Sequence, residues 1–333
     1  MLFRSDEHEP LAAPTDPLTR FAELHAALAS ERRWYTDHAP LRLAAVCLIT
    51  TPGDAVSLAA ATRRQDSALG AQFGWLSSID PAVRMLIAAQ MVKHDDDPAE
   101  FVLEVERVRA MFRAVGLRRG GVYEVLAVLV LRRVLGEVAI DRSHIERFRD
   151  IYEAMKRHHW WLTGPEDFPA CAMLLARPED PASIGAGTDA IYRALHERAQ
   201  LWRGDSLQAA ANVLYLAGAE PEELADRFAL LLAGFRTDAT QHIGQGQYDE
   251  LAILCFLAWP IERILETVLA TRDQLRATQS WIGKAGALNL AASLAFVRIS
   301  ADDGALGPLA DAKLLLDMQT ITAARHAAIA AAV

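Results

Sequence analysis

A phrase of apolar, alanine-rich residues recurs along the chain roughly every 40 residues, and this recurrence restricts the fold more than any other feature. A more charged stretch separates one copy from the next. Such recurrence is typical of stacked helical hairpins, because no hairpin can bury its apolar face without its neighbours. The sequence therefore predicts an all-α fold of about six α/α helical-hairpin repeats with a period of about 40 residues. The copies stand at 81–91, 122–131, 168–176, 207–217, 248–258 and 287–296.

The two helices of each predicted hairpin differ in how their apolar residues are distributed. In the segment 144–155, Ile145, Phe148 and Ile151 share one stripe and charged residues fill the other face, as in a surface helix. The recurring phrase is apolar on nearly every side, which is typical of a helix that is covered all round. The inner helices of an open solenoid need a polar stripe, so the pattern predicts a strongly curved solenoid or a closed α/α toroid.

The polar start of the chain and the repeats divide it into two parts. Residues 1–14 include two prolines and predict a flexible N-terminal tail, whereas residues 15–333 predict a single α-helical repeat domain. Ser143 with Glu146 predicts a capping box at one helix start. Other helix starts carry an Asp-Pro pair, in which the aspartate caps the helix and proline supplies a preset φ. Examples of such pairs begin at Asp16, Asp80 and Asp97.

Charge and composition limit the classes of partner. The net charge is −9 with a pI near 5.6, and no basic stripe is present, so the sequence predicts no binding to nucleic acid. The start has no apolar signal-peptide core, and the longest apolar stretch is too short to span a bilayer. We therefore expect a cytoplasmic protein without membrane association. Cys47, Cys171 and Cys255 lie within apolar runs, which predicts buried free thiols.

Strong enzyme motifs are missing from the sequence. Gly283-Lys284 lacks the spacing of a phosphate-binding loop, and the stretch 244–249 lacks the third glycine of a dinucleotide-binding loop. No HExxH pair is present, and the cysteines form no cluster with histidines. The sequence accordingly predicts no cofactor and no metal, and it leaves any catalytic residues unknown.

The turn that leads into each inner helix is the most polar segment of its hairpin. If the hairpins stack in register, these turns meet at one end of the array, where the N-termini of the inner helices favour an anionic ligand. His159 and Asp167, together with His242, are residue types that can transfer protons or bind a metal. The candidate ligand-binding residues are His159, Thr163, Asp167, Asp205, Gln208, His242 and Asp249.

A structural interpretation of these residues is favoured, with a ligand site as the alternative. Asp167 and Asp205 are residues that cap helices whatever the function, and a histidine at a helix end commonly contacts the terminal carbonyl groups. Trp160, Trp161 and Trp202 flank the turns. They are interpreted as packing anchors in preference to a substrate platform.

Two stretches resemble a known protein family. The stretch 155–176 resembles the M-K-x-H-x-x-L-T-x-x-D-D-Y-like motif of that family, here with H-x-x-L-T-x-x-x-D spacing, and 201–217 resembles its G-N-x-L-Q-like motif. The family is a bacterial domain of unknown function, so the resemblance implies no activity. Phe168 and Asp205 depart from the usual Tyr and Asn. The second departure weakens any requirement for an amide in that turn.

Two functions are compatible with these features. The first is a binding or scaffolding protein without catalytic activity, because helical-repeat arrays are usually recognition surfaces. The alternative is an enzyme, a hydrolase or transferase that acts on a small anionic substrate at the N-terminal ends of the inner helices. The partner is accordingly a protein or a small-molecule ligand. The alanine-rich residues 309–333 are expected either to cap the array or to form a homodimer contact.

Overall fold

The computed structural model describes residues 16–30, 38–72, 79–136, 138–238, 243–278 and 282–300. Within these ranges every regular secondary-structure element is a helix, which confirms the all-α prediction. The predicted N-terminal tail and the segment 309–333 lie outside the described residues.

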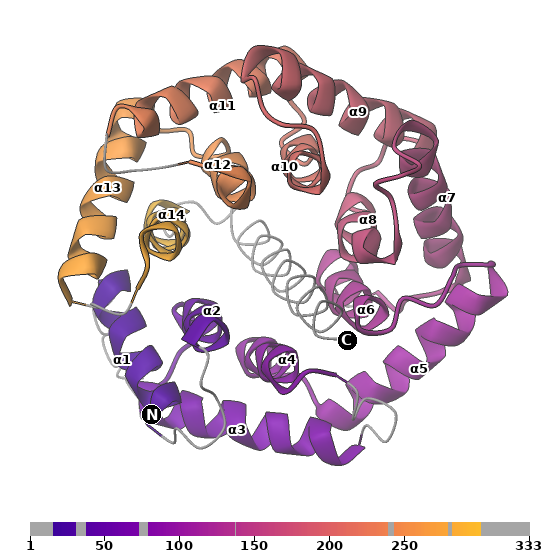
Figure 1. The fold of residues 1–333 in the computed structure, drawn as a ribbon. Helices are drawn as coiled ribbons and strands as arrows, with labels where there is room; N and C mark the ends of the chain where they lie inside the picture. The colour runs from indigo at the N-terminus through magenta and orange to yellow at the C-terminus, as the bar shows by residue number, and fades with distance from the viewer. Residues whose placement is uncertain are drawn as a thin grey trace, which may run out of the picture.

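The helices alternate along the chain between an outer and an inner position (Figure 1). The outer helices are α1 (Pro17–Ala29), α3 (Ala55–Gln72), α5 (Pro98–Ala114), α7 (Arg142–His158), α9 (Pro181–Arg198), α11 (Pro221–Arg236) and α13 (Ile261–Thr278). The inner helices are α2 (His38–Leu48), α4 (Pro81–His94), α6 (Val122–Leu135), α8 (Phe168–Leu174), α10 (Asp205–Tyr215), α12 (Tyr248–Leu254) and α14 (Lys284–Ser300). Two short 3-10 helices, η2 (Pro165–Asp167) and η3 (Gln245–Gln247), lead directly into α8 and α12.

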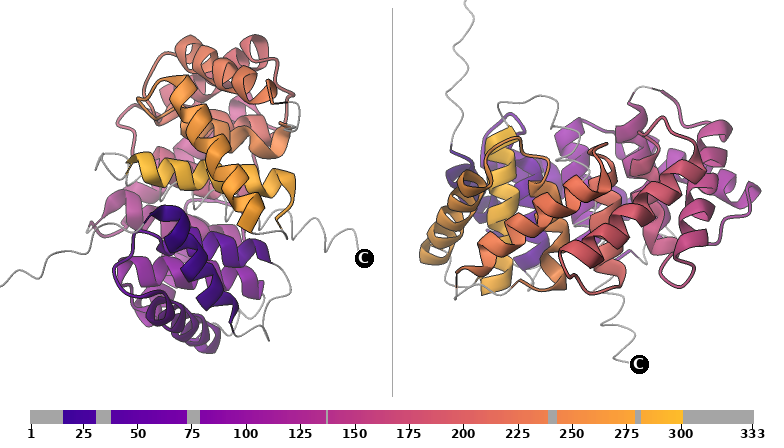
Figure 2. Two further views of the ribbon diagram at one scale, coloured as in Figure 1. Left: turned by 90° about the vertical axis from the view of Figure 1, so that its left-hand side faces the viewer. Right: turned by 90° about the horizontal axis from the view of Figure 1, so that it is seen from above.

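The last described helix returns to the first ones. α14 contacts both α1 and α2, and Figure 1 shows the outer helices as a ring around the inner ones. Figure 2 shows the ring edge-on, and its height in these views is smaller than its width. Each outer helix contacts the next one along the chain, so the turns that lead into neighbouring inner helices can share side-chain contacts.

The inner helix α2 is not among the six recurring phrases. Pro40 and Arg42 interrupt its apolar pattern, so the phrase is not recognisable in the sequence. In the structure Leu41, Ala44 and Cys47 of α2 are buried, and the helix packs against α4 and α14. The inner layer therefore contains a helix that the recurrence does not predict.

Side-chain caps begin several helices, and one of them differs from the prediction. The prediction of a capping box from Ser143 and Glu146 is wrong, because α7 begins at Arg142 and Asp141 caps it. The Asp141 carboxylate accepts a hydrogen bond from the His144 N–H at 3.0 Å, which leaves Ser143 inside the first turn. The caps that form as predicted are those of Asp16, Asp80 and Asp97.

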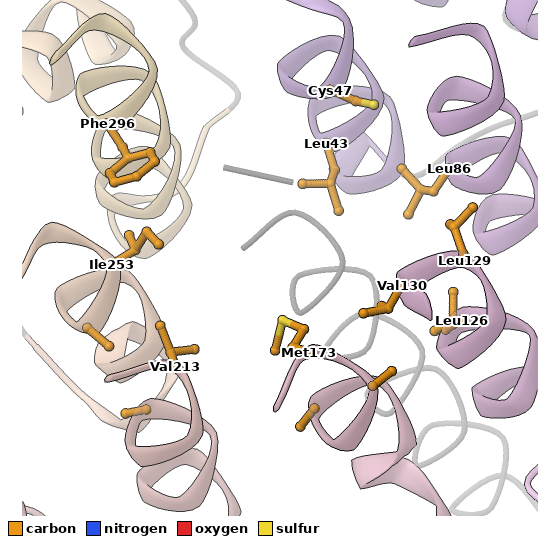
Figure 3. Packing of buried hydrophobic residues seen from close by; sticks show 14 of the residues in the cluster. Leu43, Cys47, Leu86, Leu126, Leu129, Val130, Met173, Val213, Ile253 and Phe296 are labelled. Carbon is orange, nitrogen blue, oxygen red and sulfur yellow. The ribbon is translucent and has the colours of Figure 1, made fainter. Parts of the chain in front are cut away.

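The two kinds of helix are buried as their apolar patterns predict. In α7 the buried side chains include Ile145, Phe148 and Ile151, which lie on one stripe. In α6 every residue from 122 to 131 is buried. Apolar side chains of several inner helices point toward the middle of the ring (Figure 3), among them Leu43, Leu86, Val130, Met173 and Ile253.

The three cysteines are free and buried, as the sequence predicts. Burial raises the pKa of the Cys255 thiol to about 12 and that of Cys171 well above its usual range, so both thiols are protonated at neutral pH. None of the described helices combines the length and the apolar composition that crossing a bilayer requires.

Candidate functional site

Four of the turns that lead into inner helices each contain the same kind of hydrogen bond, in which the N–H of a glycine donates to a side chain. We call Gly120, Gly164, Gly204 and Gly244 the turn glycines; they recur at about the spacing of the hairpins. All four acceptor side chains are buried. The bonds run from Gly120 to Glu124 Oε1 (3.0 Å), from Gly164 to Asp167 Oδ2 (3.1 Å), from Gly204 to Tyr192 Oη (3.1 Å) and from Gly244 to Gln247 Oε1 (2.9 Å).

Local geometry requires glycine at two of these positions. A Cβ atom on Gly120 would lie 3.0 Å from the ring of Phe168 and 3.2 Å from Pro165, so a side chain there would press on the next hairpin. Gly204 has φ +142°, a conformation that L-residues rarely adopt. The turns are thus positioned by backbone geometry together with one buried acceptor each.

The carboxyl group of Asp167 connects two hairpins. Its Oδ2 accepts from Gly164, and its Oδ1 accepts from Nε2 of Gln208 at 3.3 Å. The same amide nitrogen lies 3.5 Å from Oγ1 of Thr163. Burial raises the pKa of Asp167 to about 8, and the negative charge of Glu166 adds to the rise. At neutral pH the carboxyl group is therefore mostly protonated.

Gln247 repeats this arrangement in the turn before α12. Its Oε1 accepts from Gly244, and its Nε2 donates to Oδ1 of Asn289 on α14 at 3.3 Å. The pair of Asp167 with Gln208 and the pair of Gln247 with Asn289 are therefore equivalent, since each connects a turn glycine to the next inner helix. Equivalent bonds in separate hairpins indicate a structural role.

His159 is the C-cap of α7 and has neighbours of its own. Its Nε2 lies 3.2 Å from Oδ1 of Asp189 in α9, and its ring centroid lies 4.5 Å from that of Tyr192. Burial lowers the pKa of His159, and the Asp189 carboxylate partly opposes that effect. Tyr192 also accepts the hydrogen bond from Gly204. One side chain therefore links the turn before α8 to the turn before α10.

Four of the seven candidate residues belong to two adjoining networks of contacting side chains. Thr163, Asp167 and Gln208 share the first. His159 belongs to the second, with Asp189. His159 and Asp167 therefore bind different partners rather than each other, and proton transfer between them has no direct path in this geometry.

The other three candidate residues take no part in these networks. Asp205 is exposed at the first residue of α10, where Gly204 is the N-cap, so the interpretation of Asp205 as the cap is wrong. Asp249 lines a separate cavity of about 190 Å³ at the junction of α2, α12 and α14. His242 lies outside the described residues. Across the described ranges, His, Cys, Asp and Glu side chains nowhere gather in threes as metal ligands would.

Residues 43–327 match the model of a family described as "Protein of unknown function (DUF4003)". The chain belongs to this family. The DUF4003 match confirms that the chain is a member of a family of unknown function, and it covers every turn glycine and every candidate residue. No curated protein and no solved structure matches the chain.

The exposure of three tryptophans in this DUF4003 chain differs from the prediction. Trp160, Trp161 and Trp202 are 71%, 64% and 76% exposed, so their interpretation as packing anchors is wrong. The buried rings of His159 and Tyr192 take the packing positions between the two turns instead. The amino-acid composition of the turns is compatible with both arrangements: tryptophans packed in the core, or exposed tryptophans beside buried His159 and Tyr192.

Sequence reasoning also missed the buried acceptors Glu124 and Tyr192 and the His159 partner Asp189. The recurrence of the turn glycines was the available signal for the first two, because a regular spacing of glycines within one chain marks equivalent turns. No comparable signal exists for Asp189, which lies on an outer helix among other charged residues.

Proposed function

We propose that this protein is a binding or scaffolding protein without catalytic activity, a closed α/α toroid of helical-hairpin repeats whose partner docks at one end of the ring. The observation that carries the proposal is the exposure of three tryptophans on two adjoining turns. We call Trp160, Trp161 and Trp202 the tryptophan surface. The first two lie between α7 and α8, and the third lies between α9 and α10.

Two members of the tryptophan surface, Trp160 and Trp161, pack against each other, and Trp202 lies on the adjoining turn. Single exposed apolar side chains are common on soluble proteins, whereas contiguous ones mark sites of interaction. Burying one large apolar side chain is worth about 1.5–3 kcal/mol, so covering three of them favours association. The remaining large apolar side chains that are exposed in the described part of the chain are scattered over separate segments: Val56, Leu103, Val138 and Leu230.

Contacts beneath the tryptophan surface place its two turns beside each other. The ring of Trp161 lies 6.5 Å from that of His159, which in turn lies 4.5 Å from that of Tyr192. Tyr192 accepts from the N–H of Gly204, two residues after Trp202. The two tryptophans of the first turn pack edge to face at 5.7 Å. Buried side chains thus hold the backbone that carries all three indoles.

A protein partner fits this surface better than a small ligand. Tryptophan is enriched at the centres of protein interfaces, where its large ring is desolvated and few torsions are immobilised. Small-molecule sites are concave and enclose their ligand. The three indoles are exposed rather than enclosed, and a partner with a complementary apolar surface can cover them together.

The alternative, an enzyme that acts on a small anionic substrate at the N-terminal ends of the inner helices, has one supporting observation. The protonated carboxyl group of Asp167 is of the kind that can act as a general acid. Its two oxygens, however, accept from Gly164 and Gln208, and the ring of His159 lies between Asp189 and Tyr192. The geometry therefore supports the enzyme less well than the binding protein.

Affinity capture with three forms of the protein tests the proposal. The forms are the wild type, the variant W160S/W161S/W202S, and a control variant V56S/L103S/L230S. The control removes exposed apolar side chains that are isolated on α3, α5 and α11. We expect the wild type and the control to retain the same protein from a lysate of the source cells, and the tryptophan variant to lose it.

The retained protein is then purified and titrated against each form by calorimetry. We expect the tryptophan variant to bind it at least about tenfold more weakly, which corresponds to about 1.4 kcal/mol. The proposal is wrong if all three forms bind equally, or if the wild type retains no protein reproducibly.

A further inference from the structure

We infer that a groove between α5 and α6 binds a phosphate group. The groove has a volume of about 360 Å³ and lies beside the turn that contains Gly120. This inference is independent of the tryptophan surface, because no tryptophan lines the groove. The lining residues are Glu106, Arg109, Ala110, Arg113, Arg119 and Glu124.

The groove follows from the spacing of residues on α5. Positions 106, 109, 110 and 113 are separated by three, four and seven residues, so they share one face of the C-terminal half of the helix. The chain then turns back through Gly121, whose φ of +59° suits glycine. The turn carries Arg119, and the first turn of α6 carries Glu124. Three guanidinium groups therefore line one groove from two chain segments.

A buried carboxylate orients two of these guanidinium groups. Glu124 is fully buried and accepts hydrogen bonds from both Arg109 and Arg113, as well as from the N–H of Gly120. Arg113 also donates to the carbonyl oxygen of Leu117 at 2.7 Å. A guanidinium group has five N–H donors, so these two bonds leave Arg113 with donors for a ligand.

The charges of the groove favour an anion. The cations Arg109, Arg113 and Arg119 outnumber the carboxylates Glu106 and Glu124, although the whole chain has a net charge of −9. Arg119 is exposed, and no acidic partner contacts it in the part of the chain that the structure describes. An anionic ligand would therefore add a partner for Arg119 without breaking an existing ion pair.

A phosphate group matches these donors better than a carboxylate. Guanidinium groups bind phosphate oxygens through paired N–H donors and lose less hydration than an ammonium group does. A phosphate monoester has a charge of about −1.5 to −2 and three acceptor oxygens. Donors that reach a ligand from α5 and from the following turn can bind different oxygens of a tetrahedral group, whereas a planar carboxylate offers only two.

The neighbouring residues Arg118 and Arg119 allow a closely matched test. Both are exposed arginines of the same turn, but only Arg119 lines the groove. The variants R119Q and R118Q therefore remove the same charge from nearly the same place. Inorganic phosphate is titrated into the wild type and each variant at constant ionic strength, and binding is followed by phosphorus NMR and calorimetry. We expect R119Q to weaken binding about tenfold and R118Q to weaken it less than about twofold.

The phosphate group can belong to a free ester or to a phosphorylated segment of a partner protein. A second titration with a phosphoserine peptide, alongside its unphosphorylated form, distinguishes these sources. Tighter binding of the phosphopeptide than of inorganic phosphate assigns the group to a partner protein, and equal binding assigns it to free phosphate esters. Both outcomes support the inference when R119Q, but not R118Q, reduces the affinity.

Two outcomes overturn the inference. One is equal weakening by R118Q and R119Q, which would show that phosphate responds to overall charge and not to the groove. The other is the absence of measurable binding of either probe to the wild type. The variant W160S/W161S/W202S should bind phosphate as the wild type does. The phosphate-binding proposal and the proposal of a partner at the tryptophan surface can therefore be refuted independently of each other.

Discussion

The turn before α8 and the turn before α12 have the same hydrogen-bond geometry but different chemistry. In the first turn, the carboxyl group of Asp167 accepts hydrogen bonds from the N–H of Gly164 and from the side-chain amide of Gln208. In the second, Gln247 accepts from Gly244 and donates to Asn289. The acceptor is an ionisable carboxyl group in one turn and a neutral amide in the other, although both occupy the same place in their hairpins.

This comparison shows that the turn requires a buried acceptor and not a charge. A neutral amide is sufficient in the turn before α12, and the raised pKa of Asp167 makes its carboxyl group neutral at pH 7 as well. The N–H groups of the turn glycines therefore explain why Asp167 and Gln247 are polar. The features that distinguish the turn before α8 are the two exposed tryptophans, Trp160 and Trp161.

The largest expected effect is on the pH dependence of stability, through Asp167→Asn. The pKa of Asp167 is about 8 in the folded protein and about 3.9 in the unfolded chain. Between these values the folded state holds the extra proton, so stability falls as the pH rises from about 4 to about 8, by up to about 1.4 kcal/mol per pH unit. The asparagine side chain cannot ionise, so the variant should lose this slope. Urea unfolding at several pH values measures it.

The matched change in the other turn is Gln247→Glu, which should introduce a similar slope. Comparing each variant with the wild type removes the contribution of other groups, including His25, whose pKa burial lowers to about 4. An Asp167→Asn variant that kept the wild-type slope would show that the carboxyl group is ionised in the folded protein.

The second comparison removes each acceptor completely. Asp167→Leu and Gln247→Leu each leave the N–H of a partly buried turn glycine without its acceptor. An unsatisfied buried donor costs about 1–3 kcal/mol, so both variants should lose stability by that amount. Urea midpoints at pH 6 provide the measurement. A loss at only one of the two positions would break the equivalence of the turns.

The third comparison removes the partner on the next inner helix. Gln208→Leu and Asn289→Leu leave the glycine bonds in place, so each should lose only about 1 kcal/mol. Asn289 also donates to the carbonyl oxygen of Gly246 at 3.0 Å, so its replacement should have the larger effect of the two. The reverse order in thermal unfolding would contradict the assignment of these bonds.

The smallest expected effect on folding is at the tryptophan surface. Trp160, Trp161 and Trp202 are exposed, so changing any one to serine should alter the free energy of unfolding by no more than about 0.5 kcal/mol. Thermal unfolding of the single variants checks this. A loss of several kcal/mol would show that the indoles pack in the core, as the sequence alone suggested.

The sequence predicted the parts of the fold that depend on local patterns. The stripe of Ile145, Phe148 and Ile151 and the uniformly apolar phrase of α6 correctly indicated an outer and an inner helix, because burial follows helical periodicity. The pattern failed at α2, where Pro40 and Arg42 interrupt the apolar run.

The candidate site was less predictable because its contacts join distant segments. The polar residues of the turns and helix starts drew attention to Asp167 and Gln208, but the hydrogen bond between them depends on how neighbouring helices align. Likewise, Trp202 is exposed, whereas Tyr192, which accepts a hydrogen bond from Gly204 in the same turn, is buried. Neither outcome is contained in the local composition of a turn.

The most direct test of the division between structural and binding residues is to compare two variants in one binding experiment. Asp167→Asn and W160S/W161S/W202S are each titrated with the protein that the wild type retains, after circular dichroism confirms that both are folded. We expect Asp167→Asn to bind with wild-type affinity and the tryptophan variant to bind at least about tenfold more weakly. Loss of binding in Asp167→Asn, with binding kept in the tryptophan variant, would contradict this division and place the functional site at the polar turn.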